Sequence, residues 1–381
     1  MSAHVLRSGG RINAWLGLLL SALLVGCAGG ADKPKPTELG PNAALINVRL
    51  AWSARLGRVD LPLDVRVSGN TVTLASSDGT VVAIDAATGQ DLWRTRLATT
   101  LEAGAGSDGR YAAVVSSANE LIVLEAGREL WRERLGALTY TAPLVAGARV
   151  FVMTADRAIA AFDAQSGRRL WTYVRQGEQL LALRQAGTLF AAGDTLVAGL
   201  SGRLVGLNPL NGSVRWEGVI ANPRGTNDVE RLVDIVGRVS RDGDVACARA
   251  FQASVGCVNT VRGSLLWTKS ANGAQGVHGD GEMVVGTEAD GRVIAWRRTD
   301  GERIWTSERL KYRDLTAPQF LGRSIAIGDV QGFVHFLARQ DGAPLARVAT
   351  DGSPIAAAPV LVANTLVVVT RNGGVFGFRP D

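Results

Sequence analysis

Cysteine, histidine and methionine each occur only three times among the 381 residues of this chain. Apart from His4, the histidines are His278 and His335, and neither has the spacing to a cysteine that a zinc site requires. No Gly-rich phosphate loop leads into a helical pattern, no Gly-x-Ser-x-Gly turn occurs, and the carboxylates are scattered without pairing. The sequence therefore predicts no metal, no cofactor and no catalytic residue, and it predicts that the chain is not an enzyme.

Both later histidines have simple structural interpretations. His278 precedes Asp280 in a Gly-containing stretch and could form a His-Asp pair, but no nucleophile has a recognised spacing to it. A histidine in a turn is therefore the favoured interpretation. His335 alternates with apolar residues, which is typical of a strand residue that faces the surface or a channel.

A strong charge of one sign is also lacking, because 41 Lys and Arg residues stand against 35 Asp and Glu residues, for a formal net charge of +6. No basic cluster is interleaved with aromatic residues, so nucleic acid is not an expected partner. The apolar run Ala14–Val25 is too short to span a bilayer comfortably. Because it follows Arg7 and Arg11, we expect residues 1–26 to be an export signal.

The end of this signal has the pattern of a bacterial lipobox, Leu24-Val25-Gly26-Cys27. We expect the Cys27 thiol to accept diacylglycerol before cleavage, and its acyl chains would hold the chain at a membrane. An ordinary secretory signal followed by a chance cysteine is the alternative. Ala28, rather than Asp, follows the cysteine, which resembles the sorting pattern of outer-membrane lipoproteins. The Pro- and Gly-containing residues 27–44 are expected to form a flexible tether.

What the chain does contain is a tryptophan repeat with spacings of 41, 38, 40, 45, 51 and 38 residues. A period of about 40 residues, made of short alternating β runs with Gly turns, is typical of one blade of a β-propeller. We interpret each indole as an anchor between neighbouring blades rather than as a ligand-stacking residue. The repeating positions are Trp52, Trp93, Trp131, Trp171, Trp216, Trp267 and Trp305.

The blade count follows from the ends of the repeat. Ala346 stands where a further tryptophan belongs, and residues 360–378 form a last blade that lacks its terminal Leu-Trp strand. Trp52 lies in an orphan strand with no blade before it, so pairing this strand with the last blade closes the ring and removes open sheet edges. The sequence therefore predicts an all-β fold over residues 45–381: an eight-bladed propeller of four-stranded antiparallel blades, closed by the N-terminal strand.

Two cysteines remain after Cys27. Cys247 and Cys257 flank Phe251-Gln252-Ala253 symmetrically, so a three-residue hairpin loop would place them opposite each other on paired strands. In an exported protein a disulfide is favoured over two buried thiols.

The phrase Ala-x-Asp-x-x-Thr-Gly-x-x-Leu-Trp, clearest at residues 83–93, resembles the repeat of quinoprotein dehydrogenases. Those enzymes are longer and carry a Cys-Cys dipeptide, which this chain lacks. The lipobox, the tether, the orphan Trp52 strand and the repeats more closely resemble the BamB family of lipoproteins. The resemblance implies a non-enzymatic scaffold of the outer-membrane β-barrel assembly (BAM) complex, anchored at the periplasmic face of the outer membrane. It would bind the POTRA domains of BamA and assist the folding and insertion of nascent outer-membrane β-barrel proteins.

Two long connections are the candidate partner-binding surface. The widest tryptophan spacings place added length in residues 173–188 and 220–239, and inserted loops often carry function. Leu181-Ala182-Leu183-Arg184 matches a Leu-x-Leu-Arg motif through which BamB-like proteins contact BamA, and Asp234 matches half of an Asp-x-Asp motif. Without the resemblance, the leucines could equally be core residues. A quinoprotein-like dehydrogenase propeller and a periplasmic sugar- or peptide-binding propeller remain the alternative functions.

Overall fold

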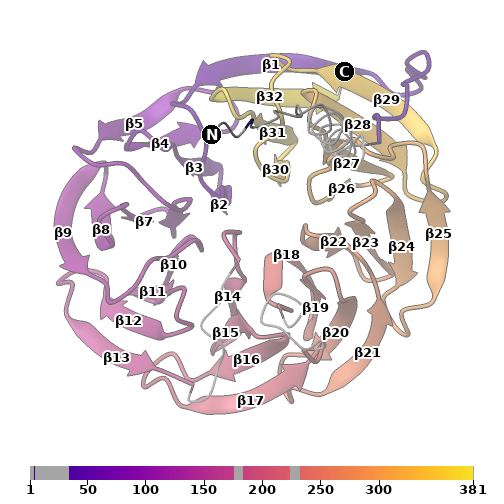
Figure 1. The fold of residues 1–381 in the computed structure, drawn as a ribbon. Helices are drawn as coiled ribbons and strands as arrows, with labels where there is room; N and C mark the ends of the chain where they lie inside the picture. Colours follow the sequence, from indigo (N-terminus) through magenta and orange to yellow (C-terminus); the bar gives the residue numbers. More distant parts are fainter. Residues whose placement is uncertain (1–3, 5–33, 176–182, 224–231, 381) are drawn as a thin grey trace. The chain divides into compact units, whose positions relative to one another are not determined.

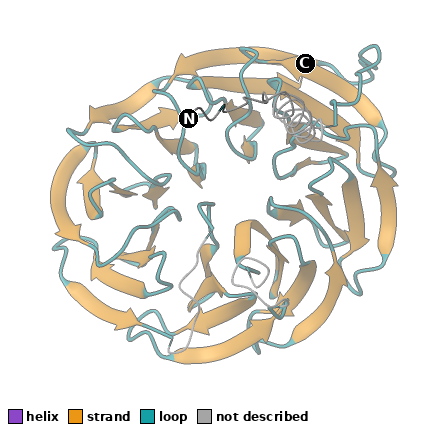
Figure 2. Cartoon of the chain, in the orientation of Figure 1, coloured by secondary structure: helices purple, strands orange, loops and turns teal. Residues whose placement is uncertain are grey.

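In the computed structural model, residues 36–381 form a ring of eight four-stranded antiparallel sheets, or blades (Figure 1). The structure describes residue 4 and residues 34–175, 183–223 and 232–380. Within this part of the chain the elements are strands and loops only, as Figure 2 shows. No helix there is long and apolar enough to cross a membrane. The predicted all-β, eight-bladed propeller is confirmed.

The strands of each blade run in sequence order from the centre of the ring outward, except that the outermost strand of the eighth blade is β1. The innermost strands of blades 1 to 8 are β2 (Arg66–Ser68), β6 (Gly106–Ser107), β10 (Leu144–Ala146), β14 (Leu189–Ala192), β18 (Ile235–Asp242), β22 (Val277–Gly279), β26 (Gln319–Leu321) and β30 (Val360–Val362). The second strands are β3 (Thr71–Ala75), β7 (Tyr111–Val115), β11 (Arg149–Met153), β15 (Thr195–Leu200), β19 (Val245–Ala250), β23 (Met283–Thr287), β27 (Ser324–Gly328) and β31 (Thr365–Val369). The third strands are β4 (Thr80–Asp85), β8 (Glu120–Glu125), β12 (Ile159–Asp163), β16 (Arg203–Leu207), β20 (Ser254–Asn259), β24 (Val293–Arg297), β28 (Phe333–Ala338) and β32 (Gly374–Pro380). The outermost strands are β5 (Asp91–Arg96), β9 (Arg128–Arg134), β13 (Arg169–Tyr173), β17 (Val214–Val219), β21 (Leu265–Ser270), β25 (Arg303–Ser307), β29 (Pro344–Ala349) and β1 (Val48–Arg55).

The ring closes through the pairing of β1 with β32. The register runs from Val48 opposite Pro380 to Arg55 opposite Gly374, with one bulge between Leu50 and Trp52. The first and last strands therefore share one sheet, as predicted, and the ring has no open blade edge at its junction.

The core lies between the blades. Every residue of β7 and of β15 is buried, because a middle strand is covered on both faces by neighbouring sheets. The outermost strands instead alternate, and in β17 only Trp216 and Gly218 are buried. This alternation points one tryptophan per repeat toward the next blade.

Five of the repeat tryptophans donate their indole N–H to a backbone carbonyl in the following blade. Each acceptor lies in the turn between the third and outermost strands of that blade. The pairs are Trp52 with Ala86 (3.0 Å), Trp131 with Ala164 (2.8 Å), Trp171 with Pro209 (3.0 Å), Trp267 with Arg298 (2.6 Å) and Trp305 with Arg339 (2.8 Å). The indoles thus join consecutive blades by packing and by a directed hydrogen bond.

Two separate constraints require a glycine in the same turn. Gly167 has a φ of +75°, which favours glycine, and a Cβ there would lie 2.8 Å from the Trp131 ring. Gly89 lies under Trp52 in the same way. The turn glycine and the preceding tryptophan are therefore one packing unit, which explains why they recur together.

Two tryptophans and one alanine depart from this pattern. Trp93 faces the shortened turn of blade 2 and has no hydrogen-bond partner among the described residues, and the buried Trp216 N–H has none either. Ala346 is buried where the missing tryptophan would stand, and it packs in a cluster that contains Phe376 and Phe378. The aromatic side chains of Phe376 and Phe378 in the last blade therefore pack at this junction.

The segment before β1 lies along blades 6 and 7. The N–H of Thr37 donates to the Lys311 carbonyl (3.0 Å), and Leu39 packs on an apolar cluster of these blades. Further on, the N–H of Leu45 donates to the carbonyl of Leu345 in β29 (2.7 Å). The sequence placed residues 27–44 in a flexible tether, whereas these contacts hold the described part from Thr37 onward against the ring.

Candidate partner-binding site

The two connections singled out by the sequence are longer than any other between blades. Residues 174–188 join β13 to β14, and residues 220–234 join β17 to β18. Each runs from an outermost strand to the innermost strand of the next blade. All such connections lie on the same face of a propeller ring, which we call the connection face.

The described end of the first loop pairs through its backbone with the start of β18, which directly follows the second loop. Gly187 forms an isolated antiparallel bridge with Val236, and the Gly237 N–H donates to the Ala186 carbonyl (2.7 Å). The Thr188 hydroxyl donates to the Gly237 carbonyl (2.8 Å). The paired residues are 49 to 51 positions apart in sequence, and their contacts join the two predicted segments into one surface unit.

Leu183 and Arg184 lie at the start of this unit, whereas Leu181 lies outside the described residues. Leu183 is half-buried and lines two adjoining cavities, one of them shared with Asp234 and Arg157. The Arg184 side chain is 65% exposed and contacts the Glu102 carboxylate at 3.3 Å. An exposed ion pair of this kind contributes about 0–1 kcal/mol, so the guanidinium can exchange Glu102 for another acceptor at little cost.

Asp234 has a different environment. Its carboxylate accepts a hydrogen bond from Arg157 (3.0 Å), and the two side chains are only 16% and 7% exposed. Its carbonyl accepts from the Phe251 N–H (2.9 Å). The structure therefore ties Asp234 to blade 3 and to blade 5, and leaves little of its carboxylate for a partner.

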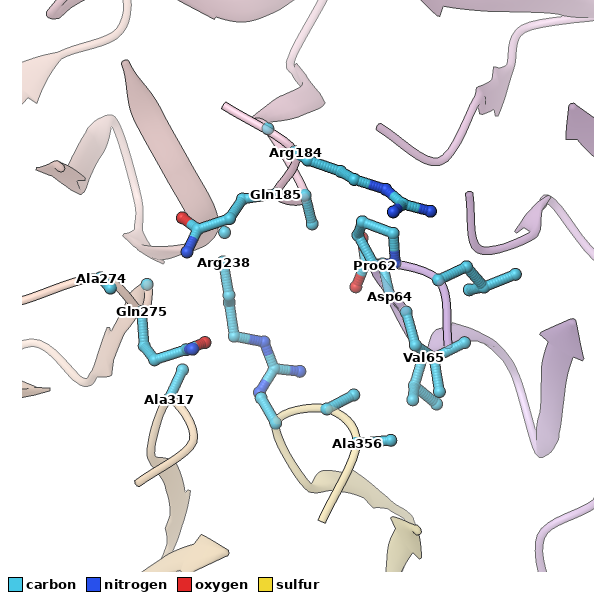
Figure 3. Close-up of a pocket in the computed structure, with 18 of the residues that line it drawn as sticks. Pro62, Asp64, Val65, Arg184, Gln185, Arg238, Ala274, Gln275, Ala317 and Ala356 are labelled. Atoms are coloured by element: carbon cyan, nitrogen blue, oxygen red, sulfur yellow. The ribbon is translucent and has the colours of Figure 1, made fainter. Parts of the chain in front are cut away.

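Beside the two loops, the inter-blade connections line a cavity at the centre of the ring, which we call the channel. A cavity of about 320 Å³ is lined by Arg184, Gln185, Arg238 and Gln275, among others, and these side chains surround one opening (Figure 3). Arg238 Nη1 donates to Gln319 Oε1 (2.6 Å) and to the Pro359 carbonyl (3.2 Å), so it crosses from blade 5 to blades 7 and 8. Burial lowers the pKa of Arg238, and the like charge of Arg66 adds to this effect against the attraction of Asp64.

The turn predicted for His278 and the exposure predicted for His335 were wrong, although His335 does lie on a strand, β28 (Phe333–Ala338). His278 lies on the inner strand β22 rather than in a turn, and its Nδ1 accepts the Phe320 N–H (3.3 Å). Burial lowers the pKa of His278 to about 3, with further contributions from the charges of Arg238 and Arg298. A neutral ring is the form that can accept this hydrogen bond.

His335 is buried rather than on the surface or in the channel. Its Nε2 lies 2.9 Å from Asp329 Oδ2, which also pairs with the buried Arg313 at 2.8 Å. Burial by itself raises the pKa of the Asp329 carboxyl, but hydrogen bonds from His335, from the Phe333 N–H and from Arg313 outweigh burial and hold the pKa below its ordinary value. Arg313 also donates to the Thr37 carbonyl (2.9 Å), so this cluster anchors the N-terminal segment.

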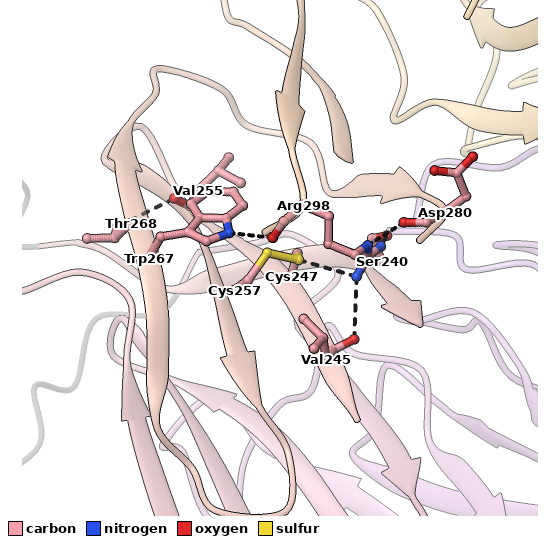
Figure 4. Close-up of a disulfide and its surroundings, with 9 residues drawn as sticks. All are labelled: Ser240, Val245, Cys247, Val255, Cys257, Trp267, Thr268, Asp280 and Arg298. Carbon is pink, nitrogen blue, oxygen red and sulfur yellow. Dashed lines mark hydrogen bonds between the residues drawn. A yellow bond between two sulfur atoms is a disulfide. The ribbon is translucent and has the colours of Figure 1, made fainter. Parts of the chain in front are cut away.

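A disulfide joins Cys247 and Cys257, which lie opposite each other on β19 and β20 (Figure 4). Both cysteines are fully buried, and Trp267 packs in the same cluster. The guanidinium of Arg298 lies 3.4 Å from the Cys247 sulfur. No group of three or more His, Cys, Asp or Glu residues in the described ranges is arranged to hold a metal ion.

Sequence reasoning missed three arginine contacts that shape this site. Arg157 and Asp234 are 77 residues apart, Arg184 and Glu102 are 82 apart, and Arg238 reaches residues 81 and 121 positions away. No local pattern marks such pairs. They follow only from the order of the blades around the ring.

Fold and repeat define the class: an eight-bladed β-propeller whose blades are joined by tryptophan docking. The family profile described as "Outer membrane protein assembly factor BamB" matches residues 77–307. A curated protein with that name from Burkholderia pseudomallei is 40% identical over 351 residues, which cover 91% of each chain. One from Bordetella pertussis is 35% identical and covers 97% of this chain and 98% of its own length. The chain belongs to the BamB family.

Solved structures agree with this membership. BamB from Moraxella catarrhalis superposes with a TM-score of 0.79 and 25% identity, over 87% of this chain and all of that one. A quinohemoprotein alcohol dehydrogenase from Comamonas testosteroni reaches a TM-score of 0.68 at 14% identity, over 90% of this chain and 78% of that one. At that identity the likeness shows a shared propeller fold alone.

Proposed function

We propose that this chain is an outer-membrane protein assembly factor: a non-enzymatic scaffold of the BAM complex that binds the POTRA domains of BamA. The family membership over nearly the whole chain supports the assembly role. The main support for the site is the backbone pairing of the end of the 174–188 loop with the start of β18, which brings Leu183 and Arg184 into one surface unit with Asp234.

The three residues act differently in this proposal. Leu183 and Arg184 are exposed enough to touch a partner, through apolar burial and a guanidinium that leaves Glu102 for a partner carboxylate or carbonyl. Asp234 is a positioning residue, because its pairing with Arg157 fixes the second loop. Removing one partner of so buried a pair costs about 3–5 kcal/mol, much of it through the charge left behind.

The test is recovery of BamA with the tagged protein from detergent-solubilised outer membranes. Leu183→Ala/Arg184→Ala is expected to reduce recovery at least fivefold, at an unchanged urea midpoint. Leu130→Ala/Arg128→Ala on β9 is the matched control, because it removes an exposed leucine and arginine from the rim of the ring and is expected to leave recovery unchanged. Equal recovery with both double variants would exclude the 183–184 site.

A positioning role for Asp234 has its own signature. Asp234→Asn keeps a hydrogen-bond acceptor for Arg157, whereas Asp234→Ala does not. We expect the Asn variant to bind BamA better than the Ala variant, and both to show altered protease sensitivity in the 220–234 loop. If both variants lose binding equally with no change in the loop, Asp234 contacts the partner directly.

A lipid on Cys27 is the proposed membrane anchor, and the segment that follows it meets the ring on the connection face. Thr37 contacts Lys311 and Arg313, which lie in the connection between β25 and β26 and hence on the same face as Leu183 and Asp234. Residues 28–36 can span about 30 Å when extended. A lipid on Cys27 would therefore keep the ring within this reach of the periplasmic surface of the outer membrane.

Labelling with radioactive palmitate tests the anchor. We expect the label on the wild type and not on Cys27→Ala. Nascent outer-membrane barrels as further partners are tested separately, by crosslinking to an unfolded barrel protein in the presence and absence of BamA.

A further inference from the structure

The channel at the centre of the ring has a charge that its own residues do not neutralise. Two adjoining cavities, of about 320 and 260 Å³, share Asp64 and Arg238 in their walls. Together they are lined by five arginines and two aspartates, and both aspartates are already paired with arginines. The five arginines are Arg66, Arg184, Arg238, Arg241 and Arg371.

Three of these guanidinium groups have no carboxylate partner among the described residues: those of Arg238 and Arg371, and that of Arg241, which lies over the Phe190 ring. Arg238 bonds only to neutral oxygens, those of Gln319 and Pro359. The Arg371 side chain is exposed at the channel and has neither a hydrogen bond nor an ion pair in the described ranges. A guanidinium in a partly dehydrated cavity attracts an anion more strongly than one on an open surface, because the effective dielectric constant is lower.

The rest of the lining fits a carboxylate on a polypeptide. Gln185 and Gln275 carry amide N–H donors, and the remaining wall includes alanines, among them Ala274, Ala317 and Ala356 (Figure 3). Alanine walls leave room for the methylenes of a Glu or Asp side chain and offer no competing charge. A cavity near 320 Å³ is at the lower end for ligand sites, which suits a short segment rather than a folded domain.

We propose that the central channel binds an acidic segment of a protein partner, with Arg238 and Arg371 holding its carboxylates. The planar guanidinium matches a carboxylate bidentately, so these two arginines set the specificity. Arg184 stands at the edge of the same cavity, with 65% of its side chain exposed, and joins the channel to the loop surface. This site shares Arg184 with the BamA-binding surface proposed above, but the proposal depends on Arg238 and Arg371 and stands without that role.

The test uses a fluorescein-labelled peptide of alternating Glu and Gly, with a Gln-for-Glu peptide as the neutral probe, in anisotropy titrations of the purified protein. We expect the Glu peptide to bind at least tenfold more tightly than the Gln peptide, and its affinity to fall as salt rises. Arg371→Gln and Arg238→Gln should each raise the Kd of the Glu peptide at least fivefold. Arg323→Gln, an exposed arginine in the turn between β26 and β27, should change Kd less than twofold.

Several outcomes would overturn the proposal. Equal binding of the two peptides would do so, as would equal effects of Arg371→Gln and Arg323→Gln. If inorganic phosphate binds as tightly as the Glu peptide and displaces it, the channel is a general anion site without a preference for polypeptide. Arg238 also bridges blades, so the Kd of Arg238→Gln counts only if its urea midpoint equals that of the wild type. If the midpoint differs, the test depends on Arg371→Gln, because the Arg371 side chain is exposed.

Discussion

The indole hydrogen bonds allow a quantitative test of how the blades are joined. Trp305 and Trp216 occupy the same position in β25 and β17 and are similarly buried, at 9% and 8% exposure. Trp305 donates to the Arg339 carbonyl at 2.8 Å, whereas the buried Trp216 N–H has no partner. Replacing each tryptophan by phenylalanine removes a similar area of aromatic ring. It removes a hydrogen bond that stabilises the fold at Trp305 and a buried unpaired N–H that destabilises it at Trp216.

The expected difference is large enough to measure. Trp305→Phe loses a hydrogen bond worth about 1 kcal/mol, whereas Trp216→Phe removes a buried unpaired donor that costs about 1–3 kcal/mol. We therefore expect Trp305→Phe to be the less stable variant by about 2–4 kcal/mol. Both Trp→Ala variants should lose about 3 kcal/mol or more, because each leaves a cavity at a blade junction.

Urea unfolding followed by far-UV circular dichroism gives the four free energies of unfolding. The alanine variants establish that both rings contribute to packing, and the phenylalanine variants isolate the N–H. If Trp305→Phe and Trp216→Phe prove equally stable, the directed hydrogen bond does not help to join the blades, and shape alone explains the tryptophan repeat.

Three further predictions concern stability. Gly167→Ala should destabilise by more than Gly193→Ala, whose positive φ is similar but whose Cβ meets open space, and urea midpoints of the two variants give the comparison. The Cys247→Ala/Cys257→Ala double variant should lose about 2–4 kcal/mol in urea under oxidising conditions, and no such difference should remain if the wild type is first reduced in the unfolded state. The Asp329 carboxyl has a lower pKa when folded than when unfolded, so it stabilises the fold above the unfolded pKa and loses this effect as the pH falls. The free energy of unfolding should therefore fall less steeply below about pH 5 in Asp329→Asn than in the wild type, and pH-dependent urea titrations measure the slope.

The tryptophan repeat was sufficient to predict the blade count and the ring closure, because both depend on local period and on matching the two incomplete ends. The repeat could not predict contacts between side chains that are distant in sequence. The burial of His335 depends on Asp329 and Arg313, and the internal pairing of Asp234 depends on Arg157, a full blade away. Leu181, part of the predicted motif, lies outside the described residues and stays a prediction.

The channel and the loop surface meet at one short backbone segment. Gly237 has a φ of +64° and donates to Ala186 of the first loop, and the next residue, Arg238, enters the channel. A Cβ on Gly237 would lie 2.8 Å from the backbone nitrogen of Gly276, so a side chain there would disturb the loop pairing and the arginine together. Substitutions at Gly237 therefore cannot separate loop binding from channel binding. Leu183 and Arg371 can, because each lies on only one side of this junction.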